Sequence, residues 1–329
     1  MKKRINAFKY SRILIILAVI CIYITGCGAF DNSKYDQYIF NGFYFNTYVQ
    51  ITVYGEFPDE TVNGLKEMLE HYDCLFSESS EEGILDAINS NESEIVLDDE
   101  SAYLIKFMID GANLTDGKFD PTIYPVSQLW NFGENEGDIP EGNQLSDALS
   151  LCDYTRLHLD GNVLKKENTD IKISFGAVAK GYIADKTAEY LKNNGIENAL
   201  INLGGNVYCL GLKNGLDKYN IAIKKPFSDN EAATTVSVSD GMSVVTSGIY
   251  ERYFELNDTV YHHILDTTTG YPVQNGLGSV TVIGPESMIC DFLSTAYFVA
   301  YDDKEITDKL NAAYPDYEVI YVSPDGKIL

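Results

Sequence analysis

Hydrophobic and polar residues follow two regular spacings along the chain. Residues 45–54 (Phe-Asn-Thr-Tyr-Val-Gln-Ile-Thr-Val-Tyr) alternate, which is typical of a strand at the start of a folded body. Later, apolar side chains recur every three or four residues in several segments, and this spacing predicts amphipathic helices. The segments are about 62–72, 104–114, 177–191 and 286–300, and Asn194-Gly195 marks the end of the third.

The second half of the chain consists mostly of short runs that favour strands. They cover residues 199–203, 219–223, 234–238, 244–246, 261–265, 279–283 and 318–322. Strands and helices lie in separate blocks and do not alternate strictly. This order predicts an α+β fold, with one catalytic domain of packed helices and mixed or antiparallel sheets, and disfavours a doubly wound nucleotide-binding sheet. Residues 131–142 are rich in Gly, Glu and Asn and are expected to form an exposed loop.

The N-terminal segment has the features of a secretory signal. Basic residues within positions 2–12 precede an apolar run at 13–24. This run is too short for a comfortable membrane span, which needs about 20 residues. It ends at Thr25-Gly26-Cys27, an arrangement that lipoprotein-processing enzymes recognise, whereas the bulky Ile20 makes Cys21 a poorer site.

We therefore expect a lipoprotein signal peptide at 1–26, a lipidated tether at 27–40 and the catalytic domain at 41–329. Cys27 is the expected lipidated residue and would carry palmitate. The body of the protein would then be anchored at the extracytoplasmic side of the cell membrane. An uncleaved N-terminal anchor is the alternative, and it places the body outside the cytoplasm as well.

The charge balance disfavours a nucleic-acid function. Acidic residues outnumber basic ones by 49 to 24, and the formal net charge is −25 over 329 residues. This charge repels phosphate backbones, so an anionic substrate would need local cations or a metal ion to hold it. The cysteines beyond the lipid site form no CxxC pair and have no His at ligand spacing, so we expect buried free thiols and no zinc site; they are Cys74, Cys152, Cys209 and Cys290.

The helix expected at 286–300 carries the clearest candidate for a metal site. Asp291 and Thr295 are four residues apart, so their oxygens share one helix face. A carboxylate and a hydroxyl suit Mg²⁺, which completes its coordination with water and phosphate. Helices often carry this pair on a solvated face, however, and that is the alternative interpretation.

Residues 173–182 (Ile-Ser-Phe-Gly-Ala-Val-Ala-Lys-Gly-Tyr) pass from a strand through glycine into a helix. The free backbone N–H groups of the first turn, with Lys180, form a candidate phosphate site. The alternative is a tight strand-to-helix turn with an exposed Lys180. A second glycine pair, Gly204-Gly205, permits close approach of a ligand or forms a simple bulge. Neither segment is a GxGxxG or P-loop motif.

Half of the four histidines of the chain stand together, at His262 and His263. In a strand they point to opposite faces, so at most one of them faces a given site. A general base is one interpretation, and a histidine paired across strands is the other.

Taken together and in order, these segments resemble the FAD:protein FMN transferases, the ApbE-type flavin transferase lipoproteins. The matching stretches span the body from about Phe45 to Tyr301, and their ordered series is specific to the family. They are Asp116-Gly117-Lys118-Phe119-Asp120-Pro121-Thr122, Leu129-Trp130-Asn131-Phe132-Gly133, residues 176–182, Asn202-Leu203-Gly204-Gly205-Asn206, Thr246-Ser247-Gly248 with Tyr250-Glu251-Arg252, His263-Ile264-Leu265-Asp266 with Thr269-Gly270-Tyr271-Pro272, and 291–295.

The resemblance implies a Mg²⁺-dependent transfer of FMN from FAD to a Thr or Ser hydroxyl of an acceptor protein, with release of AMP. It implies that Asp291, Thr295 and the carbonyl of Ala177 hold the metal. His263 or Asp266 is the expected acceptor of the hydroxyl proton. It further implies an FAD site whose residues are listed here: Phe45, Lys118, Phe119, Asp120, Ser174, Lys180 and Leu265.

The chain departs from many relatives at three places. Ser174 stands where they have Asp, Phe45 where they have Met, and Thr267 where they have Pro. None of these changes touches Asp291 or Lys180.

The expected partners are FAD and exported acceptor proteins, such as electron-transfer subunits, that carry a Ser/Thr-Gly-Ala-Thr-like sequence. This chain has no such sequence, so action in trans is expected. One alternative uses the same metal site: a Mg²⁺-dependent FAD pyrophosphatase that releases FMN and AMP. The other is a lipid-anchored flavin-binding protein without catalysis, which would not need the Asp291–Thr295 pair.

Overall fold

The structure is a computed structural model, and it describes residues 37–77, 80, 83–133, 137–213 and 215–329. Within these residues, no helix has both the length and the apolar character needed to cross a bilayer. The expected signal peptide and Cys27 lie outside the described residues, as does most of the expected tether.

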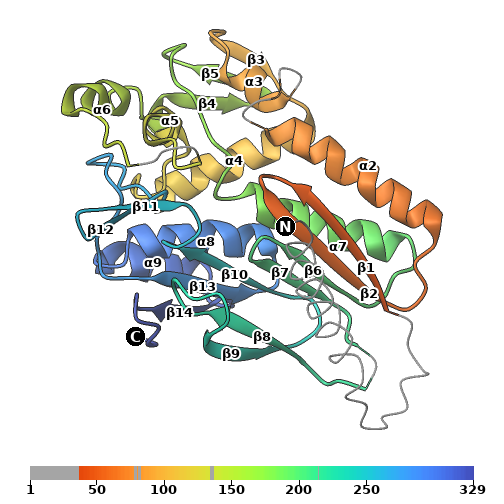
Figure 1. Ribbon diagram of the computed structural model, residues 1–329. Helices are drawn as coiled ribbons and strands as arrows, with labels where there is room; N and C mark the ends of the chain where they lie inside the picture. The colour runs from red at the N-terminus through yellow and green to blue at the C-terminus, as the bar shows by residue number, and fades with distance from the viewer. Residues whose placement is uncertain (1–36, 78–79, 81–82, 134–136, 214) are drawn as a thin grey trace, which may run out of the picture. The chain divides into compact units, whose positions relative to one another are not determined.

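A seven-stranded antiparallel sheet organises the domain (Figure 1). Its spatial order is β1-β2-β6-β7-β10-β13-β14, so β1 and β14 are the edges. The strands are β1 (Gln37–Tyr44), β2 (Thr47–Tyr54), β6 (Ala199–Leu203), β7 (Asn206–Leu210), β10 (Met242–Gly248), β13 (Ser279–Gly284) and β14 (Glu318–Val322). Alternating buried residues such as Val49, Ile51 and Val53 in β2 place one side of the sheet in the main core.

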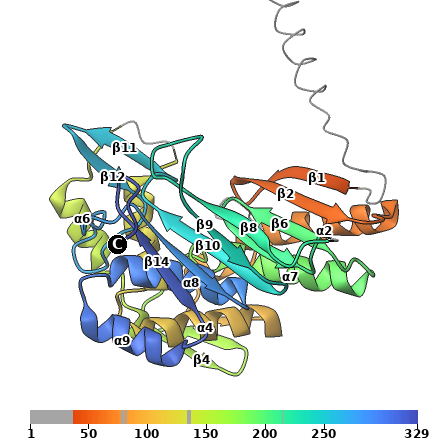
Figure 2. The same cartoon turned by 90° about the horizontal axis from the view of Figure 1, so that it is seen from below.

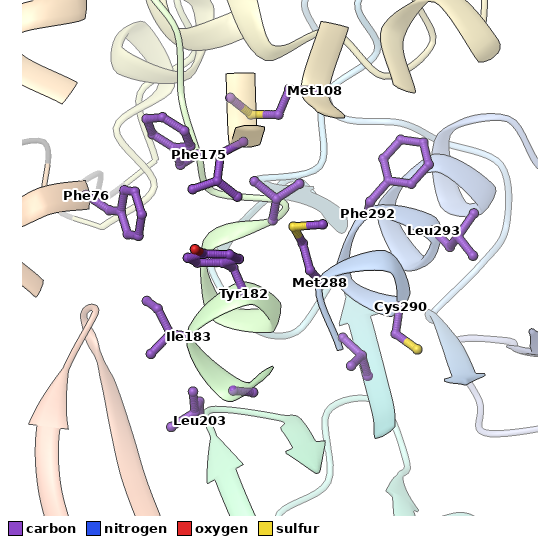
Figure 3. Packing of buried hydrophobic residues seen from close by; sticks show 14 of the residues in the cluster. Phe76, Met108, Phe175, Tyr182, Ile183, Leu203, Met288, Cys290, Phe292 and Leu293 are labelled. Atoms are coloured by element: carbon purple, nitrogen blue, oxygen red, sulfur yellow. The ribbon is translucent and has the colours of Figure 1, made fainter. Parts of the chain in front are cut away.

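Two helices cover that side of the sheet, α7 (Ala179–Asn193) against β6 and β7, and α8 (Ser287–Val299) against β10 and β13. They pack directly on each other, with α2 (Asp59–Phe76) on α7 and α4 (Asp99–Leu114) near α9 (Lys304–Ala313). Figure 3 shows Tyr182 of α7 and Met288 of α8 among the buried side chains of this layer, and the ring of Tyr182 packs against Phe76 of α2. The sheet therefore carries a helical layer whose two central members bring the middle and the late part of the chain together.

The hairpin of β8 (Tyr219–Lys224) and β9 (Ala232–Val238) lies on the opposite side of the sheet (Figures 1 and 2). Its buried residues Tyr219 and Val238 form a second core with Cys209, Val244 and Ile283. Both sides of the central strands are thus covered.

Smaller elements complete the domain. One group is the three-stranded sheet of β3 (Glu94–Val96), β5 (Val163–Lys166) and β4 (Leu157–Asp160) beside α3 (Ile84–Asn89). Another packs around the fully buried Trp130 and contains α5 (Tyr124–Trp130), α6 (Gly142–Leu149), β11 (Tyr253–Leu256) and β12 (Thr259–His262). The short 3₁₀ helices are η1 (Pro121–Ile123) and η2 (Tyr154–Arg156).

The structure corrects three expectations. β1 begins at Gln37, so residues 37–40 belong to the sheet and not to the expected tether, which makes the start of the domain earlier than 41. The strand expected at 261–265 is β12 and ends at His262. All four cysteines of the domain are free thiols, but Cys74 is exposed and Cys152 only half-buried, so only Cys209 and Cys290 match the expected burial.

Candidate active site

α7 and α8 lie close together at Gly181. A Cβ atom at this position would lie 2.3 Å from the carbonyl oxygen of Ser287, so only glycine lets the two backbones approach this closely. The Gly181 amide donates a hydrogen bond of 2.9 Å to Oδ2 of Asp291, which is 3% exposed. The start of α7 and the middle of α8 are therefore joined at the carboxylate.

The bond from Gly181 also affects the carbonyl of Ala177. In a regular helical turn the amide of residue 181 would donate to the carbonyl four residues earlier, whereas here it donates to Asp291. The Ala177 carbonyl therefore does not accept the hydrogen bond that Gly181 would donate in a regular helix. The other carboxylate oxygen, Oδ1, lies 3.9 Å from Nζ of Lys180, too far for a hydrogen bond.

Thr295 lies one turn after Asp291 and belongs to a group of hydroxyls that connects α8 to β10. Oγ of Ser247 lies 3.2 Å from Oγ1 of Thr295 and 2.7 Å from Oγ of Ser294, and Ser294 donates to the carbonyl of Asp291 at 2.9 Å. A buried carboxylate oxygen, a backbone carbonyl and a hydroxyl are hard oxygen donors. This donor set fits Mg²⁺, which prefers such ligands, and does not fit a soft metal.

Asp185 holds the N-terminus of α8 from the neighbouring helix. Its two carboxylate oxygens accept hydrogen bonds from the amides of Ser287 and Met288, at 2.8 and 2.9 Å. Burial raises the pKa of Asp185 to about 6, and the two amide bonds offset only part of that rise. Asp185 therefore fixes the position of the helix that carries Asp291 and Thr295.

Within the segment 118–120, Phe119 packs against α8. The ring of Phe119 is buried and meets Phe292 edge to face, with centroids 5.0 Å apart, so this side chain belongs to the core. Asp120 caps η1 by accepting from both the amide and the hydroxyl of Thr122, at 2.8 and 2.6 Å. Burial raises the pKa of Asp120, and its bonds to Thr122 oppose the rise.

Lys118 and Asp266 line one surface cavity of about 570 Å³, together with Val299 at the end of α8. Asp266 uses Oδ1 to accept from the amides of Thr268 and Thr269, at 2.9 and 2.8 Å, and so stabilises the turn that ends at Gly270. Thr267 donates to the carbonyl of Gly117 at 2.8 Å. This bond ties the Asp266 turn to the segment before Lys118.

The two adjacent histidines have different environments. His262 is buried, and its Nε2 lies 2.9 Å from the carbonyl of Val273; burial lowers its pKa to about 4. His263 is half-buried, and its Nδ1 lies 3.4 Å from the carbonyl of Arg252. Burial, followed by the positive charges of Arg252, His262 and Lys180, lowers the pKa of His263 to about 3, so its imidazole is neutral at physiological pH. Lys180 therefore lies within electrostatic range of both His263 and Asp291.

Ser174 connects two of the matching stretches. Its amide donates to the carbonyl of Pro121 at 2.9 Å, and its Oγ accepts from the amide of Gly176 at 3.1 Å. The hydroxyl of Ser174 thus stabilises the turn before Ala177.

Two other residues expected in the FAD site have different surroundings. Phe45 lies in the β1–β2 turn with φ of 56°, and its amide donates to Asp73 at 2.7 Å. Leu265 is buried in the Trp130 cluster. The structure places Lys180 next to Asp291, with Thr295 one turn further along α8, and Ala177 lies in the turn before α7. Lys118 and Asp266 line one cavity, and Leu265, which precedes Asp266, pairs with Pro272 of the same lining.

Asp185 and Ser247 were not among the site residues expected from the sequence. Asp185 lies one helical turn after Gly181, so the two residues share a face of α7. A glycine followed four positions later by a carboxylate was therefore a local pattern that could have indicated Asp185. Ser247 had no comparable local signal, because its partners come from a helix more than 40 residues away.

Comparisons with known proteins agree with this architecture. The model of the ApbE family matches residues 45–320. A protein of Treponema pallidum (strain Nichols) named FAD:protein FMN transferase is 30% identical over 341 residues, covering 97% of this chain and 92% of its own length. The crystal structure of the ApbE protein from Thermotoga maritima superposes with a TM-score of 0.79 at 31% identity, covering 89% of this chain and 96% of that one. The flavin transferase ApbE from Vibrio cholerae gives a TM-score of 0.76 at 25% identity, with coverage of 88% and 94%.

Proposed function

The chain belongs to the ApbE family, and we propose from this membership that it is an FAD:protein FMN transferase. It moves the FMN half of FAD to a Thr or Ser hydroxyl of an acceptor protein and releases AMP. The acceptor oxygen forms a bond to the phosphorus on the riboflavin side, while the bond from that phosphorus to the bridging oxygen breaks and the electron pair leaves with AMP. The observation that carries the proposal is the junction of Gly181 and Asp291 beside Lys180.

The residues at this junction account for the binding of a pyrophosphate. Mg²⁺ held by Asp291, Thr295 and the Ala177 carbonyl would supply charge neutralisation and polarisation of the phosphorus. Lys180, 3.9 Å from Asp291, provides a second positive charge for the phosphate oxygens. These local cations allow a dinucleotide to bind a chain whose formal net charge is −25.

The flavin end of the substrate is assigned to the second group of residues. Lys118 and Asp266 line the cavity at the far end of α8, and Asp120 and Ser174 stabilise the adjacent turns. His263 is neutral at physiological pH and so has an unoccupied acceptor for the hydroxyl proton. Asp266 is the other candidate, with one carboxylate oxygen engaged by the turn amides.

A mass measurement tests the transferase activity. Purified protein, FAD and Mg²⁺ are mixed with an acceptor domain that carries a Ser/Thr-Gly-Ala-Thr-like sequence, and we expect the acceptor to gain covalent FMN. An acceptor whose flavinylated Thr is replaced by Val is the matched control and should stay unmodified. Release of free FMN and AMP, with no modified acceptor, would identify a pyrophosphatase. Flavin binding without turnover would identify a cofactor carrier.

We also propose that the protein is lipid-anchored through Cys27 at the extracytoplasmic side of the membrane, where it modifies exported electron-transfer subunits. The basic and apolar segments before Thr25-Gly26-Cys27 support this location. Membrane fractionation should find the wild-type chain in the membrane, and intact-mass analysis should find a lipid on Cys27. A Cys27→Ser variant that remains lipidated would refute the assignment.

A further inference from the structure

A lysine of the small three-stranded sheet is buried against neutral oxygens. Lys166, the last residue of β5, is 4% exposed. Its Nζ donates to the carbonyls of Ser90 at 2.7 Å, Ile88 at 2.9 Å, Thr169 at 3.2 Å and Ile171 at 3.3 Å. An ammonium group has three protons, so these four acceptors share them. Bonds from a charged donor to buried carbonyls are stronger than neutral ones, and the cluster is therefore a firm junction.

The four carbonyls come from two separate stretches of the chain. Two of them are at the end of α3, and the other two are in the segment 169–171. Asn89 strengthens the same junction, because its side chain donates to the carbonyl of Ile173 at 3.0 Å and accepts from the amide of Ile173 at 2.8 Å. The side chains of Lys166 and Asn89 thus attach residues 169–173 to the end of α3.

The attached segment leads directly into the candidate active site. Residue 174 follows at once, and its amide bonds to the carbonyl of Pro121. The Ala177 carbonyl is only four residues after Ile173, and Lys180 and Gly181 come next in the chain. A short stretch held at Ile173 and again at Gly181 has little freedom, so the position of the Ala177 carbonyl depends on both ends.

We propose that Lys166 is a positioning residue for the active site, which holds the backbone of residues 169–174 so that the Ala177 carbonyl and Lys180 face Asp291. Lys166 touches neither substrate nor metal in this assignment and acts through the segment that it anchors. The kinetic consequence rests on the proposed function, whereas the anchoring itself does not.

The neighbouring lysine provides a matched control. Lys165 precedes Lys166 in β5, points to the other face of the sheet, and makes a surface ion pair with Asp160 at 3.4 Å. Lys165→Met makes the same substitution as Lys166→Met: it removes the ammonium group and leaves an unbranched apolar side chain. It does not affect the four carbonyls. Leu310→Ala, at a fully buried position of α9, is a second control that lowers stability without changing Lys166 or any of its four carbonyl partners.

Hydrogen exchange on the full chain, without flavin or Mg²⁺, tests the anchoring. In Lys166→Met we expect the amides of residues 171–178 to exchange at least about tenfold faster than in the wild type, because local opening becomes easier. Lys165→Met and Leu310→Ala should leave the protection of this peptide, relative to the rest of the chain, unchanged. Unchanged exchange in Lys166→Met, or an equal change in Leu310→Ala, overturns the proposal. If Lys166→Met does not fold, Lys166→Gln, which keeps two donors, takes its place under the same criteria.

Kinetics test the consequence for the site. We expect the Mg²⁺ concentration for half-maximal FMN transfer to rise about 10- to 100-fold in Lys166→Met, with a smaller change of kcat at saturating Mg²⁺. In Lys166→Ala, added propylammonium should restore part of the Mg²⁺ affinity, whereas tetramethylammonium, which has no N–H donor, should not. An unchanged Mg²⁺ dependence, or equal rescue by both ions, refutes the positioning role. Absence of transfer by the wild-type protein would instead refute the proposed function, and the exchange result would remain interpretable.

Discussion

The backbone amide of Gly181 donates a 2.9 Å hydrogen bond to the carboxylate of Asp291 across the contact of α7 and α8. The residues are 110 positions apart in the chain, yet this bond joins the turn that carries Lys180 to the helix that carries Thr295. The bond requires that the backbone of α7 lies close enough to α8 to reach the side chain of Asp291. The absence of a side chain at residue 181 permits that approach.

Replacing Gly181 by Ala should therefore destabilise the domain. The added Cβ would lie 2.3 Å from the Ser287 carbonyl and 2.7 Å from Cα of Met288, so α8 must shift, at a cost of about 1–3 kcal/mol in unfolding free energy. The fluorescence of the single, fully buried Trp130 can follow denaturation. Gly142→Ala is the control: nothing lies within 4 Å of its added Cβ, so we expect a neutral or slightly stabilising effect. Equal stability of both variants would contradict the close contact.

Removing the Asp291 carboxylate should abolish most of the activity. Asp291→Ala loses a proposed metal ligand and leaves the Gly181 amide without its acceptor, so FMN transfer should fall by about a hundredfold or more. Asp291→Asn keeps an oxygen for that amide and should fold better while remaining nearly inactive. Asp110→Ala, an exposed carboxylate on α4, should keep wild-type turnover. Unchanged turnover in Asp291→Ala, measured as FMN on the acceptor, would refute the metal assignment.

Four helices were predictable because one face of each is buried over several turns, whereas the shorter α9 (Lys304–Ala313), with only Ile306 and Leu310 buried, was missed. The spacing of apolar residues predicted α2, α4, α7 and α8, and the last of them runs from Ser287 to Val299 where 286–300 was expected. The α+β class is confirmed by the antiparallel sheet and by the match to solved ApbE structures at a TM-score of 0.79. β1 is an edge strand, and its outward-facing residues Ile39 and Phe43 are apolar although 51% and 71% exposed. Apolar and polar residues therefore do not alternate along β1, and the strand was missed. The short α3 and α5 span too few turns to show a period.

The candidate site was predictable only in part, for a related reason. Asp291 and Thr295 share a helix face, and Lys180 follows a glycine turn, so each had a local signal. Their proximity to one another is tertiary, and it depends on Asp185 holding the start of α8 and on Ser247 in β10. Spacing along the chain carries no record of such contacts, so the family resemblance linked segments that local patterns could not.

The stability of the protein should carry a pH-dependent contribution from Asp185. In the folded protein its pKa is raised to about 6, whereas an unfolded Asp titrates near 4. Between these values folding takes up a proton, so the contribution to stability is fully present below about pH 4 and is lost as the pH rises through 6. The difference in unfolding free energy between wild type and Asp185→Asn should therefore be larger at about pH 4.5 than at pH 7.5, by about 1–2 kcal/mol. If the difference in unfolding free energy does not vary with pH, the pKa of Asp185 is not raised in the folded protein.

The two candidates for the proton acceptor can be separated because their side chains have different structural duties. Asp266 holds the turn amides of Thr268 and Thr269, and Asp266→Asn keeps an oxygen for them while removing the charge. His263 makes one long contact to the Arg252 carbonyl, so His263→Asn should disturb the fold little. The variant that removes the proton acceptor should lower kcat by about 10²–10⁴-fold with little change in KM for FAD. We expect this result for His263→Asn. The pKa of His263 is lowered to about 3, so in the wild-type protein protonation of this imidazole should reduce kcat only well below pH 5. A kcat loss confined to Asp266→Asn would assign the proton to the carboxylate instead.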